Sequence, residues 1–444
     1  MGSFSIVIAL FLMLFILIFE IVRKKEGVFD YLSFVNLVFF LLYVIVPVYM
    51  YLFNDNLSWH ILKTTDIEST SFFSGELLAL MFYFVMIVSY YLTNKLKITK
   101  KLKSSSSNLY GKVKDKDFFK VALILYIIGM FTWLVYMKSL GGYNEYMRLG
   151  ELVRNDGSAT QTSLAFFKHF NLLLTVSMLL FFCFIKNAKG LNKLAVLFFF
   201  VTSAIASFII LYQNGGRISL LVFIITLPVA LMIRKNRINF LALTGFVALF
   251  ILLVLFGDQF LKYGQEVNYA IPKSKIEILS SIIEEFAFPY NNLGNLIPLF
   301  PDHYDFRYGF VDLSGAIFQF IPSRVISLDF LNGETVSQFN TTLYNNYGQI
   351  PIDIVSFGYI SFGIAGVIVL ACVFGMFMKL IEALFIYKGS LISCVLYVAF
   401  LFQFSLAIIY GDPQQVFLSL FKYLFTLVLL FLIIKSPKKK VSWK

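Results

Sequence analysis

The amino-acid sequence predicts an all-α, polytopic integral membrane protein: a helical bundle of about eleven transmembrane helices with a large external loop containing short helices. Of its 444 residues, 59% are hydrophobic and only 14% are charged, an apolar share larger than a soluble core needs. Eleven apolar runs near the length that a bilayer requires divide the chain. The runs are apolar on every side, which excludes the alternating strands of a membrane barrel.

The runs give three regions. The first run lacks a preceding basic region and a small-residue cleavage site, so we expect a retained helix rather than a signal peptide. Spans are expected at residues 4–22, 31–53, 71–93, 118–138, 164–185, 192–213, 218–233, 238–256, 354–378, 389–410 and 414–434. Residues 1–256 thus hold helices 1 to 8, residues 257–353 form the large extracytoplasmic loop, and residues 354–444 hold helices 9 to 11 and a basic tail.

Lysine and arginine gather in every second loop. Residues 23–25, 95–120, 186–193, 234–237, 379–388 and 435–444 together contain 25 of the 37 basic residues. The positive-inside rule places these loops in the cytoplasm, with the N-terminus outside, the C-terminus inside and residues 257–353 outside. The net charge of +12 is then explained by orientation and by anionic lipid headgroups, and no nucleic-acid partner is expected. The serine run from Ser104 to Ser107 is expected to be a flexible cytoplasmic linker.

Neither a metal site nor a cofactor is expected. The three cysteines, Cys183, Cys372 and Cys394, all lie inside apolar runs, so neither a disulfide framework nor a metal cluster is indicated. The one Asp-x-Asp sequence, Asp115-Lys116-Asp117, lies in an expected cytoplasmic loop, where it is interpreted as solvated charge.

Arginine is favoured on the expected outer face. The cytoplasmic loops contain 22 Lys and 3 Arg, whereas the outer segments contain 6 Lys and 5 Arg. Orientation needs only positive charge, but a guanidinium binds phosphate or carboxylate at two points. The pattern therefore favours an external site for a phosphorylated ligand, with chance as the alternative. The five outer arginines are Arg148, Arg154, Arg217, Arg307 and Arg324.

Arg217 is the strongest single candidate. The sequence Asn214-Gly215-Gly216-Arg217 joins two apolar runs almost directly, and the following run is short. Arg217 is therefore expected below the outer headgroup plane, at a helix N-terminus whose free N–H groups also attract anions. The alternative is a Gly-Gly hairpin with an arginine that reaches to the interface.

Two outer segments mix charge with aromatic and amide groups, as glycan-binding surfaces do. The first contains Tyr143, Tyr146, Arg148, Glu151, Arg154 and Lys168-His169. The second, residues 257–353, is acidic and has helical signals at residues 275–288 and 310–321. It contains Lys262-Tyr263-Gly264, Pro289-Tyr290-Asn291-Asn292, Ile321-Pro322-Ser323-Arg324 and a polar tract at residues 340–349. The alternatives are an ordinary connector, with His169 as a helix cap, and a surface domain rich in turn formers.

Four short sequences follow one another in a set order: a Gly-Gly-Arg turn, Lys-Tyr-Gly, Ile-Pro-Ser-Arg, and the run Gly358-Tyr359-Ile360-Ser361-Phe362-Gly363-Ile364-Ala365-Gly366. This ordered set resembles the Wzy-type polymerases of O-antigen and related surface polysaccharides. The resemblance covers residues 133–378 and includes the topology. The arginine spacing described for some members does not fit the arginines found here. By this resemblance the bundle is expected to be GT-C-like and to lie in a bacterial cytoplasmic (inner) membrane.

The resemblance implies a metal-independent glycosyltransferase that joins polyprenyl-diphosphate-linked oligosaccharide repeat units at the outer face. A cationic cluster must stabilise the leaving diphosphate, and a carboxylate or histidine must take the acceptor's proton. Candidate catalytic residues are Arg217, Arg324, Glu151 and His169, with Glu145 and Glu285 as further possible bases. Candidate substrate or diphosphate ligands are Arg148, Arg154, Lys262, Tyr263, Tyr290 and Asn291. A chain-length regulator and a flippase are the expected protein partners.

Two other functions are open. A lipid-linked oligosaccharide flippase or other transporter would need polar groups along a path through the bilayer. The expected spans are poor in ionisable groups apart from Glu20, Gln403, Lys422 and a few termini, which disfavours that function. An O-antigen ligase shares the external-loop plan and the substrate chemistry, and differs in its acceptor.

Overall fold

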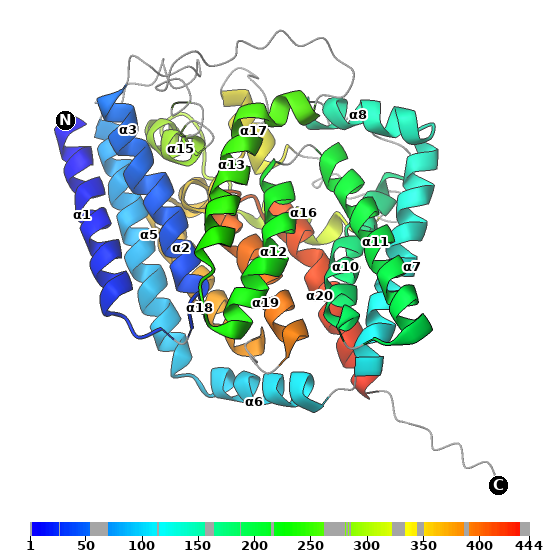
Figure 1. Ribbon diagram of the computed structural model, residues 1–444. Coiled ribbons are helices and arrows are strands. Elements are labelled where there is room, and N and C mark those ends of the chain that lie inside the picture. Colours follow the sequence, from blue (N-terminus) through cyan, green and yellow to red (C-terminus); the bar gives the residue numbers. More distant parts are fainter. Residues whose placement is uncertain are drawn as a thin grey trace.

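The structure is a computed structural model that describes residues 2–25, 27–53, 70–112, 115–155, 164–186, 188–214, 217–261, 280, 283, 286–321, 334–343, 350–385 and 390–435. Side chains are described in these ranges except at residues 2–4, 107–109, 111–112, 150–155, 217 and 253–261. All regular secondary structure in these ranges is helical (Figure 1).

Ten helical spans in the described residues are long and apolar enough to cross a membrane, so the protein is a multi-pass membrane protein. They are formed by α1 (Gly2–Val22), α2 (Tyr31–Phe40) with the π-helical turn η1 (Leu41–Ile45) and α3 (Val46–Leu52), α5 (Thr70–Asn94), α7 (Asp115–Ser139), η4 (Ala165–Phe167) with α9 (Lys168–Asn171) and α10 (Leu173–Ile185), α11 (Gly190–Gln213), α12 (Arg217–Lys235), α18 (Ile354–Phe385), α19 (Leu391–Ser405) with η7 (Leu406–Ile408), and α20 (Pro413–Lys435).

These spans coincide with ten of the eleven runs expected from the sequence. The remaining run, residues 238–256, corresponds to α13 (Phe240–Leu261), a helix of 22 residues. Its described side chains give an apolar stretch only from Phe240 to Leu252, too short by itself to count as a span. The all-helical membrane fold is therefore confirmed within the described residues, and the eleventh span stays a prediction.

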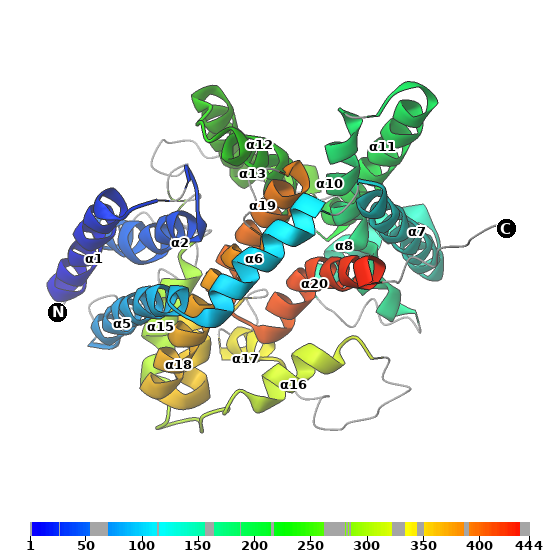
Figure 2. The same ribbon diagram turned by 90° about the horizontal axis from the view of Figure 1, so that it is seen from below.

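The helices run between two ends of the molecule. α1 begins at one end and α20 finishes at the other, while α6 (Lys97–Lys112) lies across the end at which α20 finishes (Figure 1). Viewed from that end, α6 lies in front of α19, near the centre of the bundle (Figure 2). We call this end the basic face, because α6 exposes lysines there and α12 ends on Arg234 and Lys235. The opposite end, which carries α8 (Tyr143–Asn155), is the distal face.

The serine run on the basic face is helical, so the prediction of a flexible linker was wrong. Ser106, in the middle of α6, is fully buried, and the ring of Tyr110 stacks on Phe118 of α7 with ring centroids 6.2 Å apart. At the other end of the helix the Thr99 hydroxyl donates to the Thr93 carbonyl at 2.6 Å. Tertiary contacts therefore override the weak helix preference of serine.

A sharp corner divides α18 near its N-terminal end. Phe362 and Gly363 depart from helical geometry, and Gly363 has a φ of 61°, which glycine adopts without strain. Beyond the corner, a Cβ on Gly366 would overlap the carbonyl of Gly358. The glycine-rich run noted in the sequence thus lets two helical pieces touch through their backbones.

Backbone groups freed at this corner are satisfied by the segment between α13 and α18. Its described residues, which we call the distal segment, are 280, 283, 286–321, 334–343 and 350–353. The amide of Arg307 donates to the Ile360 carbonyl at 2.9 Å, and the amide of Tyr308 donates to the Ser361 carbonyl at 3.0 Å. Buried backbone groups need such partners. The corner and residues 307–308 are therefore built as one unit.

Three short α-helices in the distal segment are described, and the first continues into the 3-10 turn η5 (Ile297–Leu299). They are α15 (Phe288–Leu296), α16 (Phe310–Phe318) and α17 (Val336–Leu343). α16 confirms the helical signal at residues 310–321, and Figure 2 shows it at the edge of the bundle, beside α20. Most of the expected helix at residues 275–288 lies outside the described residues. The Pro-Tyr-Asn-Asn sequence forms the start of α15, with Pro289 in the first turn, where proline is tolerated.

Candidate functional site

A group of buried polar side chains, which we call the distal cluster, lies between α5, η1, α15, α17 and the start of α18. Its members are at most 2% exposed to solvent: Tyr43, Glu76, Tyr290, Asn292, Asn340 and Asp353. Burying polar groups costs free energy unless they find partners, so clusters of this kind often mark function. Residues far apart in the sequence build it.

Asp353 is the best-defined member. Its Oδ2 accepts hydrogen bonds from the Val355 and Ser356 amides at 3.1 and 3.0 Å, which caps α18. The Tyr43 hydroxyl donates to the same oxygen at 3.0 Å. Oδ1 is buried and has no hydrogen-bond partner among the described residues. Burial raises the pKa of Asp353 to about 6, and hydrogen bonds from Ser356 and Tyr43 limit the rise.

Glu76 supplies a second carboxyl group, from α5. Both of its oxygens are buried without a hydrogen-bond partner among the described residues. Its charge acts on Tyr290, whose ring packs against Phe72 with centroids 5.1 Å apart. Burial, and secondly this charge, raise the pKa of the Tyr290 hydroxyl far above its usual value. Glu76 and Asp353 therefore belong to one buried polar region in the distal half of the bundle.

Side-chain amides tie the cluster to the distal segment. The Asn292 amide donates to the Pro351 carbonyl at 2.9 Å. The Asn340 amide donates to Asn292 Oδ1 at 3.2 Å and to the Ile350 carbonyl at 3.1 Å. These contacts hold α15 and α17 against residues 350–353 and so position Asp353.

The residues at Pro289-Tyr290-Asn291-Asn292 and at the start of the 340–349 tract are buried, and their contact with a glycan stays a prediction. Tyr290 is 2% exposed and Asn291 is 1% exposed, because α15 packs closely on α5: Gly294 lies against the Phe72 ring. Asn291 accepts a hydrogen bond from Asn295 at 3.3 Å. Asn340 is fully buried, and residues 344–349 lie outside the described residues.

A third buried carboxyl group, outside the distal cluster, caps α20. Asp412 is 1% exposed, and accepts from the Ser337 hydroxyl at 2.7 Å and from the Gln414 amide at 2.9 Å. Burial raises its pKa. Both oxygens are used in the structure, which distinguishes Asp412 from Asp353.

Arg307, one of the five outer arginines, is used for internal contacts. It pairs with Asp312 at 3.2 Å and donates to the Glu334 carbonyl at 2.8 Å. Its guanidinium also lies 5.3 Å from the centre of the Phe339 ring. The planar fork of this arginine therefore holds the distal segment together.

The remaining predicted site residues are only partly described. Arg148 pairs with Glu145 on α8 at 2.9 Å and is 70% exposed. His169 packs against the Phe320 ring at 5.4 Å, and its Nδ1 is buried without a described partner. Glu151 and Arg154 lie on α8 and Arg217 begins α12, but their side chains are outside the described ones. Lys262, Tyr263, Glu285 and Arg324 lie wholly outside the described residues, so the gathering of arginines stays a prediction.

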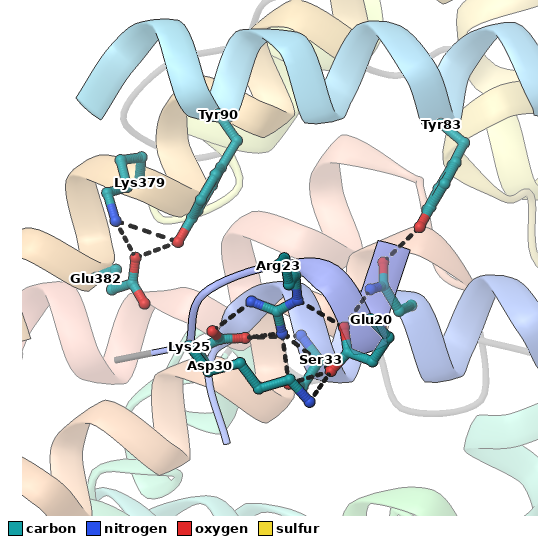
Figure 3. Close-up of polar contacts among 10 residues, drawn as sticks. Glu20, Arg23, Lys25, Asp30, Ser33, Tyr83, Tyr90, Lys379 and Glu382 are labelled. Carbon is teal, nitrogen blue, oxygen red and sulfur yellow. Dashed lines mark hydrogen bonds and ion pairs between the residues drawn. The ribbon is translucent and has the colours of Figure 1, made fainter. Parts of the chain in front are cut away.

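Near the basic face, Arg23 in the turn between α1 and α2 binds Glu20 of α1 and Asp30, the N-cap of α2 (Figure 3). Its guanidinium lies 2.6 Å from Glu20 and 2.7 Å from Asp30, and it donates to the Ser33 hydroxyl at 2.7 Å. Burial lowers the pKa of Arg23, but the hydrogen bonds that its guanidinium donates to Asp30 and Glu20 raise the pKa by more, so the cation is locked in place. This arginine fastens two helices.

A separate buried triad joins α5 to α18 (Figure 3). Lys379 Nζ lies 2.7 Å from Glu382 and 3.2 Å from the Tyr90 hydroxyl, and that hydroxyl donates to Glu382. With Glu76, these residues correct the expectation that the spans are poor in ionisable groups. α18 extends to Phe385 rather than 378, which brings Lys379 and Glu382 into the span.

Sequence reasoning missed both carboxyl groups of the distal cluster. Glu76 was detectable as a lone acidic residue inside an apolar run, a pattern that is costly in a membrane and often functional. Asp353 was detectable as an acidic residue directly before a long apolar run, the position of a helix cap. What could not be detected is their proximity, which depends on tertiary packing.

The distal cluster has the parts for moving a proton to or from a hydroxyl group. Asp353 has an unpaired oxygen and a pKa near neutrality, which suits a general base, and Tyr43 fixes its orientation. Comparison with known proteins finds no matching family model, no matching curated protein and no matching solved structure.

Proposed function

We propose that this protein is a metal-independent glycosyltransferase of bacterial inner membranes. It joins polyprenyl-diphosphate-linked oligosaccharide repeat units into O-antigen, capsule or another surface polysaccharide. The observation that carries the proposal is Asp353: a fully buried carboxyl group with a free oxygen and a pKa of about 6, oriented by Tyr43 in the distal half of the bundle. Glu76, buried in the same region, is the second carboxyl group.

Topology supports the location. The lysines of α6 and the basic end of α12 lie at the end opposite α8, and the positive-inside rule assigns the lysine-rich end to the cytoplasm. The distal face is then external, the N-terminus is outside and the C-terminus is inside. Polyprenyl-diphosphate-linked glycans in the outer leaflet would reach the distal cluster from the bilayer, as expected for a GT-C-like enzyme.

In the proposed reaction, a hydroxyl oxygen of the acceptor sugar bonds to the anomeric carbon of the donor. The bond from that carbon to the diphosphate oxygen breaks, and the polyprenyl diphosphate leaves with the electron pair. Asp353 takes the hydroxyl proton. Arg217 and Arg324 stabilise the charge that develops on the diphosphate, with Arg154 and Lys262 as further binding groups.

Buried ionisable groups in the spans favour a second candidate, a transporter of lipid-linked oligosaccharides. Glu76 lies toward one end of α5, and Lys379 and Glu382 lie toward the other end of the bundle. Lys422 is buried in α20, with its ammonium 5.2 Å from the centre of the Tyr423 ring. Groups of this kind often line transport paths. The chain-length regulator and flippase of a polymerase system would be separate proteins.

Surface glycan displayed on a gel separates the candidates. A strain that lacks the protein should show single capped repeats if it is a polymerase, no surface glycan if it is a flippase, and polymer retained on its carrier if it is a ligase. Complementation with Asp353→Asn should leave single repeats, because the amide cannot take a proton, with an expected rate loss of about 10²-fold or more. Asp412→Asn is the matched control, a buried helix cap outside the distal cluster, and should restore polymer. Full polymer with Asp353→Asn would exclude this residue as the base.

A further inference from the structure

Four uncharged side chains at the junction of α7, α8 and α11 have buried polar atoms without a hydrogen-bond partner among the described residues. The atoms are Trp133 Nε1, Tyr146 Oη, Ser207 Oγ and Gln213 Nε2. The side chains are between 0% and 8% exposed. Each can donate a hydrogen bond, so we call them the donor cluster.

The donor cluster is one packed region at the distal face, where Figures 1 and 2 show α7, α8 and α11 together. Trp133 and Tyr146 belong to a single apolar cluster with Ala206 and Ile210 of α11. Ser207 follows Ala206, and Gln213 lies seven residues after Ala206, on the same helix face. The Trp133 indole also approaches Tyr146 closely enough to oppose the rise in hydroxyl pKa that burial causes, although the two atoms form no hydrogen bond of normal geometry.

Neighbouring hydroxyls on the same helices are satisfied. Ser203, one turn before Ser207, donates to the Phe199 carbonyl at 2.6 Å. Thr132, next to Trp133, donates to the Ile128 carbonyl at 2.8 Å. Buried polar atoms are normally paired, and several unpaired donors in one place therefore indicate a region built for a ligand that accepts hydrogen bonds.

We infer that the donor cluster is a sugar-binding subsite, which takes one ring of the glycan chain. A sugar ring has apolar faces that pack on aromatic side chains and hydroxyl oxygens that accept hydrogen bonds, and it is uncharged, as the four side chains are. An anion that entered this site would exchange its water for neutral hydrogen-bond donors. Such donors compensate a negative charge less well than a guanidinium does. Gln213 ends α11, four residues before Arg217. The inference rests on the proposed function, because it places this sugar beside the proposed diphosphate site.

Trp133 provides a direct readout. The chain has three tryptophans, at positions 59, 133 and 443, so Trp59→Phe with Trp443→Phe leaves Trp133 as the only indole. The probe is the oligosaccharide repeat released by mild acid from cells that lack the protein. We expect the fluorescence of the purified full chain to change saturably with this probe. A response to inorganic pyrophosphate in place of the oligosaccharide would identify an anion site and overturn the inference.

Variants in this tryptophan background test the individual donors. Three variants should each raise the oligosaccharide concentration needed for half-saturation by roughly threefold to tenfold, the usual effect of losing one hydrogen bond: Ser207→Ala, Tyr146→Phe and Gln213→Leu. Their melting temperatures should hold or rise, because each change removes an unpaired buried group. Ser203→Ala is the matched control, a buried serine on the same helix that should bind normally. If the three donor variants bound the oligosaccharide as tightly as Ser203→Ala, the inference would be contradicted.

The two proposals fail differently. If the deletion strain makes no single repeats, the polymerase proposal fails before any binding is measured. If single repeats accumulate and Arg217 variants stop polymerisation, but the oligosaccharide leaves Trp133 fluorescence unchanged, then the sugar subsite alone is wrong.

Discussion

The hydroxyl of Tyr43 donates a hydrogen bond to Asp353, a residue 310 positions further along the chain, at 3.0 Å. Tyr43 lies in the π-helical turn η1, and π-helical turns frequently occur at functional sites. Asp353 caps α18 through the same oxygen. One carboxyl group therefore links the N-terminal helices and the start of α18 through Oδ2, and leaves Oδ1 for the proposed chemistry.

Asp353 should make stability depend on pH. Its pKa is about 6 in the folded protein against a usual 3.8, so the folded state holds the proton more tightly than the unfolded chain. This stabilisation is fully present below about pH 4 and is lost as the pH rises through 6. Between pH 5 and pH 8, wild type should lose about 1–2 kcal/mol relative to Asp353→Asn. Thermal melts of both proteins across this range measure the difference, and parallel curves would show that Asp353 does not titrate there.

Polymerisation should rise over the same interval, as the base loses its proton.

The corner in α18 should not tolerate a methyl group. Gly366→Ala puts a Cβ into the Gly358 carbonyl, so we expect a loss of about 1–3 kcal/mol, typical of overpacking. Gly245→Ala in α13 meets nothing within 4 Å, and should be neutral or slightly stabilising. Melting temperatures in detergent compare the two. Equal values would mean that the helical pieces are not in contact.

Arg23 should matter for stability rather than for catalysis. Arg23→Ala leaves Glu20 and Asp30 without their main partner, and breaking a buried pair typically costs about 3–5 kcal/mol. Lys25→Ala removes a pair with Glu20 in which the lysine is 35% exposed, and should cost less than about 1 kcal/mol. Protein level and melting temperature report both effects. If Arg23→Ala stopped polymerisation at normal protein level and stability, the structural role would be wrong.

Arg217 should require its guanidinium. We expect Arg217→Lys to abolish polymer while protein level and single repeats persist, because a point charge cannot replace a planar fork of donors. The control is Arg234→Lys, since Arg234 is an exposed arginine in the last turn of the same helix, at the basic face and away from the proposed site. Chain length on a gel is the measurement, and normal chains from the Arg217 variant would remove it from the mechanism.

Reporter fusions test the orientation. A reporter that works only outside the cytoplasm should be active when fused after Asn332, within the proposed external segment, and inactive when fused after Ser105 in α6. A cytoplasmic reporter should show the reverse. Activity of both fusions on one side would overturn the assignment of the faces.

The hydrophobic runs predicted most of the fold because the bilayer fixes helix length and composition locally. Ten expected spans are found, and the helical signal at residues 310–321 is confirmed by α16. Alternating basic loops also predicted that α6 and the end of α12 share one face. These properties depend on neighbours in the sequence.

The candidate site was harder to predict because it depends on packing. Tyr290 and Asn292 resemble exposed glycan-binding residues in the sequence, yet α15 packs on α5 and buries them. The serines of α6 resemble a linker until Ser106 is seen to be buried. Glu76 and Asp353 are separated by 277 positions in the sequence, and only the bundle brings them to one region.

Two carbonyls at the α18 corner accept hydrogen bonds from the amides of Arg307 and Tyr308. Straightening α18 would remove the acceptors of both amides at once. The bend in α18 and the position of residues 307–308 therefore depend on each other. Moving residues 307–308 away from α18 would therefore leave the Ile360 and Ser361 carbonyls without these partners.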